Sequence, residues 1–204
     1  MNERTRVALT FDAEHPDRPG CPPGTIERIL DDLAAAGARA TFFVQGRWAQ
    51  AYPAAAARIA GAGHLVGLHS HFHAEMPLLS DAGLAADIAA GGDAVRTTTG
   101  VDPRPWFRCP FGAGADDPRV LDAIAGGGYR DVGWHVVVDD WEPDRTGDVV
   151  ARDTIRGIDA HGDGAVVLLH TWPGATADAL PAILNELHRR DAVAATVDEL
   201  PELP

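Results

Sequence analysis

Two histidines four residues apart are the sequence feature best suited to chemistry. His69 and His73 follow a short apolar run at 65–68, in the segment Gly-Leu-His-Ser-His-Phe-His at 67–73. On a helical turn, residues i and i+4 share one face, so both imidazoles can reach one divalent metal ion. The alternative is a polar turn exposed to solvent, which is the favoured interpretation for an isolated histidine pair.

A pair of carboxylates stands near the N-terminus. Asp12 and Glu14 directly follow the apolar, strand-like run at 7–11. Carboxylates in such a position can serve as a metal ligand and as a general base. Considered alone, the pair is better explained as helix-capping residues or as partners in a loop salt bridge.

More polar and aromatic residues follow the other apolar runs. Arg108 comes after two aromatic residues, and an arginine in such surroundings needs a carboxylate partner, for which Asp140 is the candidate. His170 follows four apolar residues and is either a structural histidine or an acid. Trp141 and Trp172 are packing residues by default, but beside a polar site they can form the walls of a substrate pocket.

The apolar patterning predicts the elements that must position these residues. Strands are expected at 7–11, 40–44, 65–68, 105–108, 131–138, 165–169 and 192–197, and a loop at 16–23. Helices are expected from Thr25 to Gly37, over 48–62, after Ser80, after Asp117-Pro118, over 149–158 and around 180–187.

This alternation favours parallel strands wrapped by helices, as a barrel or as an open doubly wound sheet. In both folds the carboxyl ends of the strands converge on one face, where active sites lie.

Composition limits the class of protein. The 204 residues are 46% apolar and 23% charged, which suits one domain over 1–204 with a sizeable core. A net charge of −13 argues against nucleic acid and anionic membranes as partners, and the absence of lysine excludes Schiff-base chemistry. Cys21 and Cys109 fit neither a disulfide scaffold nor a thiolate zinc site. Without an apolar signal region or a membrane-spanning run, we expect a cytoplasmic protein.

With these residues in hand, the chain resembles the NodB-homology polysaccharide deacetylases, carbohydrate esterase family four. The likeness spans 7–197 and implies an α/β fold, a distorted (β/α)7 barrel. It is carried by Thr10-Phe11-Asp12, by the histidine segment 69–73, by Arg108-Cys109-Pro110-Phe111-Gly112, by Asp140-Trp141, by Leu168-Leu169-His170 and by Ala-Thr-Phe-Phe-Val at 40–44.

The resemblance implies a metal-dependent deacetylase that removes an N-acetyl group from an amino sugar or a small soluble glycan. It implies a divalent ion, usually Zn²⁺ with Co²⁺, Mn²⁺ or Ni²⁺ as alternatives, bound by two histidines and a carboxylate. The resemblance implies that Asp12 is the base and His170 the acid. It implies that Arg108 orients Asp12 and that Asp140 holds Arg108. The Phe111 backbone N–H would bind the oxyanion, and Trp141 and Leu168 would line the acyl pocket, beside which Trp172 stays a candidate wall.

Two positions depart from the family pattern. Ala13 stands where the family has its metal-binding aspartate, and Glu14 is the nearest replacement. Val137 stands where the fourth motif has its first aspartate. Relatives with a similar change at the first motif include enzymes that act on cyclic imides or other small amides. Hydrolysis of such compounds, as in the allantoinase-like branch, and a metal-free sugar-binding pseudoenzyme are therefore the alternative functions.

Overall fold

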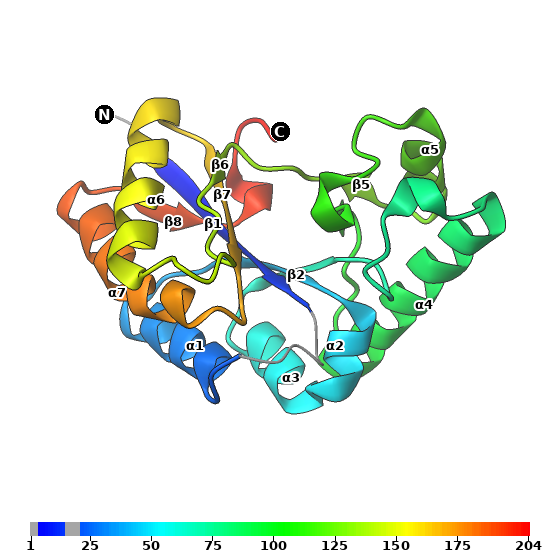
Figure 1. The fold of residues 1–204 in the computed structure, drawn as a ribbon, viewed down its shortest axis with the longest axis horizontal. Helices are drawn as coiled ribbons and strands as arrows, with labels where there is room; N and C mark the ends of the chain where they lie inside the picture. Colours follow the sequence, from blue (N-terminus) through cyan, green and yellow to red (C-terminus); the bar gives the residue numbers. More distant parts are fainter. Residues whose placement is uncertain (1–3, 15–20) are drawn as a thin grey trace. The chain divides into compact units, whose positions relative to one another are not determined.

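The computed structural model describes residues 4–14 and 21–204, and these form two compact units (Figure 1). The first unit contains 4–11, 21–41 and 134–204, and the second contains 12–14 and 42–133. The boundary falls inside the first strand, directly before Asp12. The expected loop at 16–23 lies mostly outside the described residues.

The first unit is built on parallel strands in the order β8-β1-β7-β6. Its strands are β1 (Arg6–Ala13), β6 (Val136–Val137), β7 (Ala165–His170) and β8 (Val193–Ala195). Its helices are α1 (Thr25–Ala35), α6 (Gly147–His161) and α7 (Gly174–Arg189), followed by a short 3-10 helix at Val197–Glu199.

Buried apolar residues explain why these elements form. All six residues of β7 and all but the first of β1 are buried, as near-continuous apolar runs predict for strands covered on both faces. The Thr10 hydroxyl, inside this core, donates to the Val167 carbonyl at 2.6 Å. Helix α7 packs against α1 and α6. Its apolar side chains at 180, 183, 184 and 187 are buried at helical spacing, so the expected amphipathic helix is present.

The second unit carries strands in the order β2-β3-β4-β5. The strands are β2 (Thr41–Val44), β3 (Leu65–Leu68), β4 (Trp106–Phe107) and β5 (Arg130–Asp131). The helices are α2 (Gly46–Ala51), α3 (Pro53–Gly61), α4 (Asp81–Thr99) and α5 (Pro118–Gly126), with 3-10 helices at Met76–Leu78 and Pro110–Gly112. Pairing is parallel between β3 and β4 and between β4 and β5, and α4 packs against α2, α3 and α5.

Two predicted helix starts are confirmed by their caps. The Ser80 hydroxyl accepts from the Gly83 N–H at the start of α4, and the Asp117 carboxylate accepts from the Arg119 N–H at the start of α5. For α1 the sequence predicts Thr25 as the capping residue. This is wrong by one residue, because Gly24 occupies the capping position and Thr25 is the first helical residue.

Two predicted elements are divided in the structure. The helix expected over 48–62 breaks at Tyr52, because the following Pro53 disfavours helical geometry at the residue before it and has no N–H to donate. The strand expected over 131–138 is two short strands. Between them, the carbonyls of Val132 and Gly133 accept from the Arg108 side chain.

Among residues 4–14 and 21–204, no helix combines the length and the apolar character needed to cross a membrane.

Candidate metal and catalytic site

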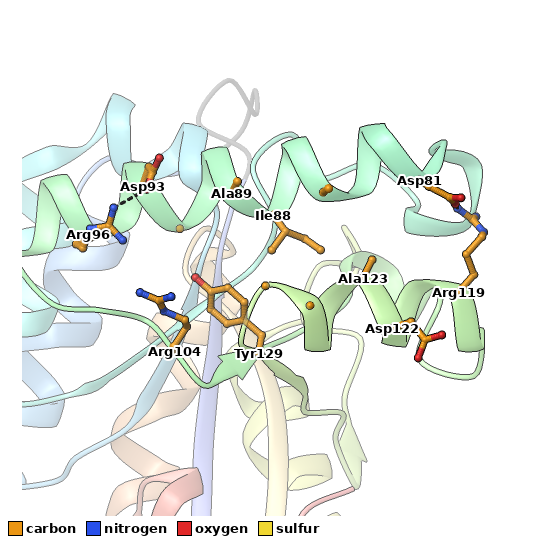
Figure 2. Close-up of a pocket in the computed structure, with 14 residues that line it drawn as sticks. Asp81, Ile88, Ala89, Asp93, Arg96, Arg104, Arg119, Asp122, Ala123 and Tyr129 are labelled. Carbon is orange, nitrogen blue, oxygen red and sulfur yellow. Dashed lines mark hydrogen bonds and ion pairs between the residues drawn. The ribbon is translucent and has the colours of Figure 1, made fainter.

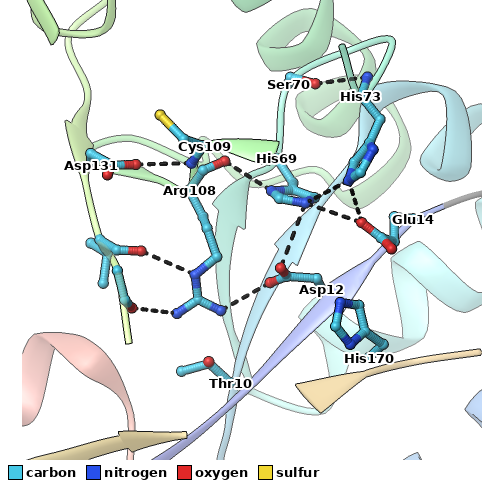
Figure 3. Close-up of polar contacts among 12 residues, drawn as sticks. Thr10, Asp12, Glu14, His69, Ser70, His73, Arg108, Cys109, Asp131 and His170 are labelled. Carbon is cyan, nitrogen blue, oxygen red and sulfur yellow. Dashed lines mark hydrogen bonds and ion pairs between the residues drawn. The ribbon is translucent and has the colours of Figure 1, made fainter. Parts of the chain in front are cut away.

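Glu14, His69 and His73 come together in the second unit (Figure 3). Glu14 follows the last residue of β1, and His69 follows the last residue of β3. The three side chains are buried, and their ligand atoms all lie within 4.8 Å of one another. Glu14 Oε2 lies 3.2 Å from His69 Nε2 and forms an ion pair with His73 Nε2. The structure thus brings the three predicted metal ligands to one point.

The hydrogen bonds of His69 prepare it as a ligand. Its Nδ1 lies 2.8 Å from the Arg108 carbonyl oxygen, which can only accept, so Nδ1 carries the proton. In the neutral ring, the Nε2 lone pair then points toward Glu14 and His73.

The donor set fits a divalent cation. The Nε2 atoms of His69 and His73 lie 3.1 Å apart, and two lone pairs this close repel unless a proton or a metal ion lies between them. Neighbouring ligands of a tetrahedral zinc ion are roughly 3.3–3.6 Å apart. Burial lowers the pKa of His69, but the Asp12 and Glu14 carboxylates together raise it above the ordinary value. The negative charge that raises this pKa also favours a cation at this point.

The segment from His69 to His73, here called the histidine loop, is not helical. The expectation of a helical turn is therefore wrong, although its consequence, two imidazoles directed at one point, holds. Ser70 and His73 have φ angles of 58° and 59°, in the left-handed region that disfavours residues with a Cβ. The Ser70 hydroxyl accepts from the His73 N–H at 2.9 Å. His71 is buried and is not part of the ligand group.

Arg108 holds Asp12 beside the ligands. Its Nη1 donates to Asp12 Oδ1 at 2.9 Å, and the other oxygen of Asp12 lies 3.6 Å from His69 Nε2. Nε and Nη2 donate to the Val132 and Gly133 carbonyls at 3.0 and 2.8 Å. The guanidinium lies 4.1 Å from the centre of the Phe43 ring. Burial lowers the pKa of Arg108 while Asp12 opposes that shift, and an arginine stays charged in proteins.

Asp140 and His170 form a second polar group, in the first unit. His170 Nδ1 donates to Asp140 Oδ1 at 2.7 Å, since a carboxylate accepts. Asp140 Oδ2 accepts from the His170 backbone N–H at 2.8 Å and from the Thr176 hydroxyl at 2.5 Å. Asp140 thus orients His170, and Arg108 binds the carboxylate of Asp12. The expectation that Asp140 also holds Arg108 stays a prediction.

The predicted substrate-contact residues occupy two kinds of position. The Phe111 side chain is 65% exposed, has a φ of 59°, and its ring centre lies 4.5 Å from that of His73. In the first unit, the Trp141 and Trp172 rings lie 5.1 and 6.1 Å from the His170 ring. Leu168 is buried in β7.

A hollow of about 930 Å³ lies in the second unit along α4 and α5 (Figure 2). Ile88 and Ala89 line it from α4 and Ala123 lines it from α5, and Arg96 and Arg104 lie near the hydroxyl of the largely buried Tyr129. Burial raises the pKa of Tyr129 to about 12. Both arginines already bind neighbouring aspartates, and the predicted site residues do not line this hollow.

Sequence reasoning missed two residues that hold the site. Thr176 gave no signal, because a threonine in the first turn of a helix is ordinary. Asp87 lies in the middle of α4 and is buried. Its position was the available signal, because Asp87 lies between the apolar residues Leu84 and Ile88, which the helix buries. A carboxylate buried beside them needs hydrogen-bond partners, so the pattern indicates that Asp87 binds another segment.

Known proteins match over most of the chain. The sequence profile described as polysaccharide deacetylase matches residues 2–132. A peptidoglycan-N-acetylglucosamine deacetylase of Listeria monocytogenes is 32% identical over 197 residues, which are 96% of this chain and 38% of that protein. The present chain thus spans well under half the length of that relative.

Solved structures are similar over nearly the full chain. A mutant of a CE4 family pseudoenzyme, with restored enzymatic activity, has a TM-score of 0.84 and 27% identity, covering 99% of this chain and 69% of that one. The wild-type pseudoenzyme, from Bacillus anthracis, has a TM-score of 0.85 and 25% identity, covering 99% and 67%. A family 4 carbohydrate esterase from Streptomyces lividans, in complex with acetate, has a TM-score of 0.80 and 28% identity, covering 94% and 92%.

The chain belongs to the polysaccharide deacetylase family, carbohydrate esterase family four. The predicted fold, the distorted (β/α)7 barrel of the NodB-homology type, is confirmed by these likenesses.

Proposed function

We propose that this protein is a divalent-metal-dependent hydrolase that removes the N-acetyl group of an amino sugar in a soluble glycan, within one catalytic domain. The observation that carries the proposal is the convergence of Glu14 with His69 and His73, beside Asp12. Glu14 supplies the carboxylate ligand that is missing at Ala13. The names of the relatives support a glycan substrate, and the cytoplasmic location stays a prediction.

The metal ligands in this proposal are His69 Nε2, His73 Nε2 and a Glu14 oxygen. An ion held there supplies Lewis acidity toward the amide oxygen and lowers the pKa of water in the site. Zn²⁺ suits two imidazoles and one carboxylate, and Co²⁺, Mn²⁺ and Ni²⁺ accept the same donors.

Asp12 is the proposed general base. Its carboxylate is held by Arg108 on one oxygen, and the other oxygen is directed to the ligand group. It takes a proton from water as the water oxygen attacks the amide carbon. The Phe111 backbone N–H is the proposed donor to the oxyanion that develops on the amide oxygen. The exposed ring of Phe111 offers an apolar face to a sugar.

His170 is the proposed acid. The Asp140 carboxylate fixes its Nδ1 proton, so Nε2 is the nitrogen that gives a proton to the departing amine as the C–N bond breaks. The products are acetate and the free amino sugar. The proposed contacts for the acyl group and the sugar are Leu168, Trp141 and Trp172. The rings of the two tryptophans lie near the His170 ring.

Metal analysis and acetate release test the proposal. The purified protein is expected to bind one Zn²⁺ or Co²⁺ and to release acetate from N-acetylglucosamine oligomers. Glu14→Ala is expected to weaken metal binding, whereas Glu27→Ala, an exposed glutamate on α1, leaves it unchanged. Zinc at 100 times its Kd should raise Tm by roughly 5–11 °C. Unchanged metal affinity in Glu14→Ala would exclude Glu14 as a ligand.

A pseudoenzyme is the second candidate, favoured by Ala13 and by the likeness to the Bacillus anthracis protein. It predicts no stoichiometric metal and no acetate release after addition of zinc, cobalt or manganese. The cyclic-imide alternative is measured in the same screen, because ring opening of small imides without acetate release would favour it.

A further inference from the structure

We infer that Asp87, on helix α4, is the positioning residue that fixes the histidine loop in the conformation needed for metal binding. The inference rests on the metal site proposed above, and it assigns a role to a residue outside the ligands and the catalytic groups. It starts from the backbone of the loop, which is unfavourable on its own.

The loop contains two strained residues. Ser70 and His73 both adopt left-handed φ angles, which cost residues with a Cβ free energy and persist where surrounding contacts enforce them. His73 is itself a proposed ligand, so the direction of its imidazole depends on keeping this backbone. The two residues between them, His71 and Phe72, must therefore be held in place.

Asp87 provides that hold. Its Oδ2 accepts from the His71 N–H at 2.8 Å, and its Oδ1 accepts from the Phe72 N–H at 3.0 Å. Both carboxylate oxygens are used, and the residue is only 5% exposed. Charge-assisted bonds from backbone N–H groups are among the stronger hydrogen bonds in proteins, and burial strengthens them further.

The carbonyl groups of the loop are held by α2. The Gly46 N–H donates to the Ser70 carbonyl at 2.9 Å, and the Arg47 N–H donates to the His71 carbonyl at 3.3 Å. The carbonyls of the loop thus bind one helix, and its N–H groups bind a carboxylate on another.

Close packing leaves the loop little room to shift. A Cβ at Gly91, one turn after Asp87 on α4, would lie 2.9 Å from the Ser70 carbonyl carbon and oxygen. A Cβ at Gly46 would lie 2.9 Å from the Gly91 Cα and 2.3 Å from His71 Nδ1. Glycine at both positions lets α2 and α4 approach the loop at backbone distance.

Asp87→Asn tests the inference, since the variant keeps the shape but replaces one acceptor oxygen by a donor NH₂ group. Asp93→Asn is the matched control, because Asp93 lies on the same helix, is exposed and pairs with Arg96. Asp87→Asn is expected to weaken Zn²⁺ binding roughly 10–100-fold, as the loss of a ligand-orienting contact does, and to alter the visible spectrum of bound Co²⁺. Asp93→Asn should leave both unchanged.

Hydrogen–deuterium exchange gives a readout that does not depend on metal. In the metal-free protein, a peptide spanning 69–73 should exchange at least about tenfold faster in Asp87→Asn than in the wild type. Far-UV circular dichroism establishes that each variant is folded. If Asp87→Asn does not fold, Asp87→Glu, which keeps the charge but displaces the carboxylate from the His71 and Phe72 N–H groups, is the second variant, with the same expected changes.

The outcomes separate the two hypotheses. If the wild type binds metal and the folded variant binds it equally well, the role of Asp87 is refuted while the proposed function stands. If the wild type binds no metal, the proposed function fails. Hydrogen–deuterium exchange of the peptide 69–73 then tests whether Asp87 holds the loop. Faster exchange in the variant supports its hold on the loop, and unchanged exchange overturns it.

Discussion

Replacing Arg108 by methionine should destabilise the protein more than almost any other charged-to-apolar change. The Arg108 side chain is 1% exposed and that of its partner Asp12 is 5% exposed. Methionine fills much of the same volume but leaves the Asp12 carboxylate without its cation. It also removes the donor to the Val132 and Gly133 carbonyls.

The burial of both side chains determines how much free energy of unfolding is lost. Removing one partner of a buried ion pair costs about 3–5 kcal/mol, because the remaining charge is desolvated and unpaired. For a chain of this size, that corresponds to a fall in Tm of roughly 6–20 °C. In the double variant Arg108→Met/Asp12→Asn, a neutral amide replaces the carboxylate, so no unpaired charge stays buried. The cost of the double variant should therefore fall short of the summed single costs by about 2–3 kcal/mol.

Arg104 and Asp102 provide the matched control. They form a bidentate pair in the same unit, but their side chains are 46% and 45% exposed. Surface pairs contribute about 0–1 kcal/mol, so Arg104→Met, Asp102→Asn and their double variant should each cost about that much or less.

The assay is urea denaturation of the metal-free protein, with excess chelator, followed by far-UV circular dichroism and by tryptophan fluorescence. Coincident transitions by the two probes justify two-state free energies. A cost below about 1 kcal/mol for Arg108→Met, or simple additivity in the double variant, would refute the electrostatic reasoning.

Two further predictions concern histidines. His170→Gln should lower kcat by about 10²–10⁴-fold in acetate release, because glutamine cannot give up a proton, and should leave zinc affinity unchanged; a normal kcat would exclude His170 as the acid. His135→Gln should flatten the loss of stability in acid. Burial first, and then His161, lower the pKa of His135, and its Nδ1 accepts from the Val166 N–H. The unfolded chain therefore binds the proton more readily, and stability falls as pH drops through about 6.5; equal slopes of unfolding free energy between pH 7.5 and 5.5 in variant and wild type would contradict this.

Local patterns predicted most strands and helices because their burial is local. The run at 65–68 matches β3, and the caps at Ser80 and Asp117 begin α4 and α5. The division of 131–138 was not predictable, because it depends on carbonyls that bind a side chain more than twenty residues earlier, in Arg108.

The candidate site shows the same limit. The residue types at its core were readable, and Glu14 was identified as the nearest carboxylate to the gap at Ala13. The pairing of Arg108 with Asp12 was implied by the family resemblance. The pairing of Asp140 with His170 was not predicted, because two residues 30 positions apart give no local signal of their contact. The left-handed backbone of the histidine loop was also hidden, because Asp87 enforces it from sixteen residues beyond His71.

The close contact between Gly46 on α2 and Gly91 on α4 affects which size of metal ion the proposed site can accept. Because Gly46 and Gly91 let both helices approach the backbone of the histidine loop, a side chain added at either position would force the loop that carries His73 to shift. A site braced in this way adapts poorly to ions of different size. Retuning it toward a larger ion therefore begins at these two glycines, where an added methyl group would displace the loop while the ligand residues themselves stay unchanged.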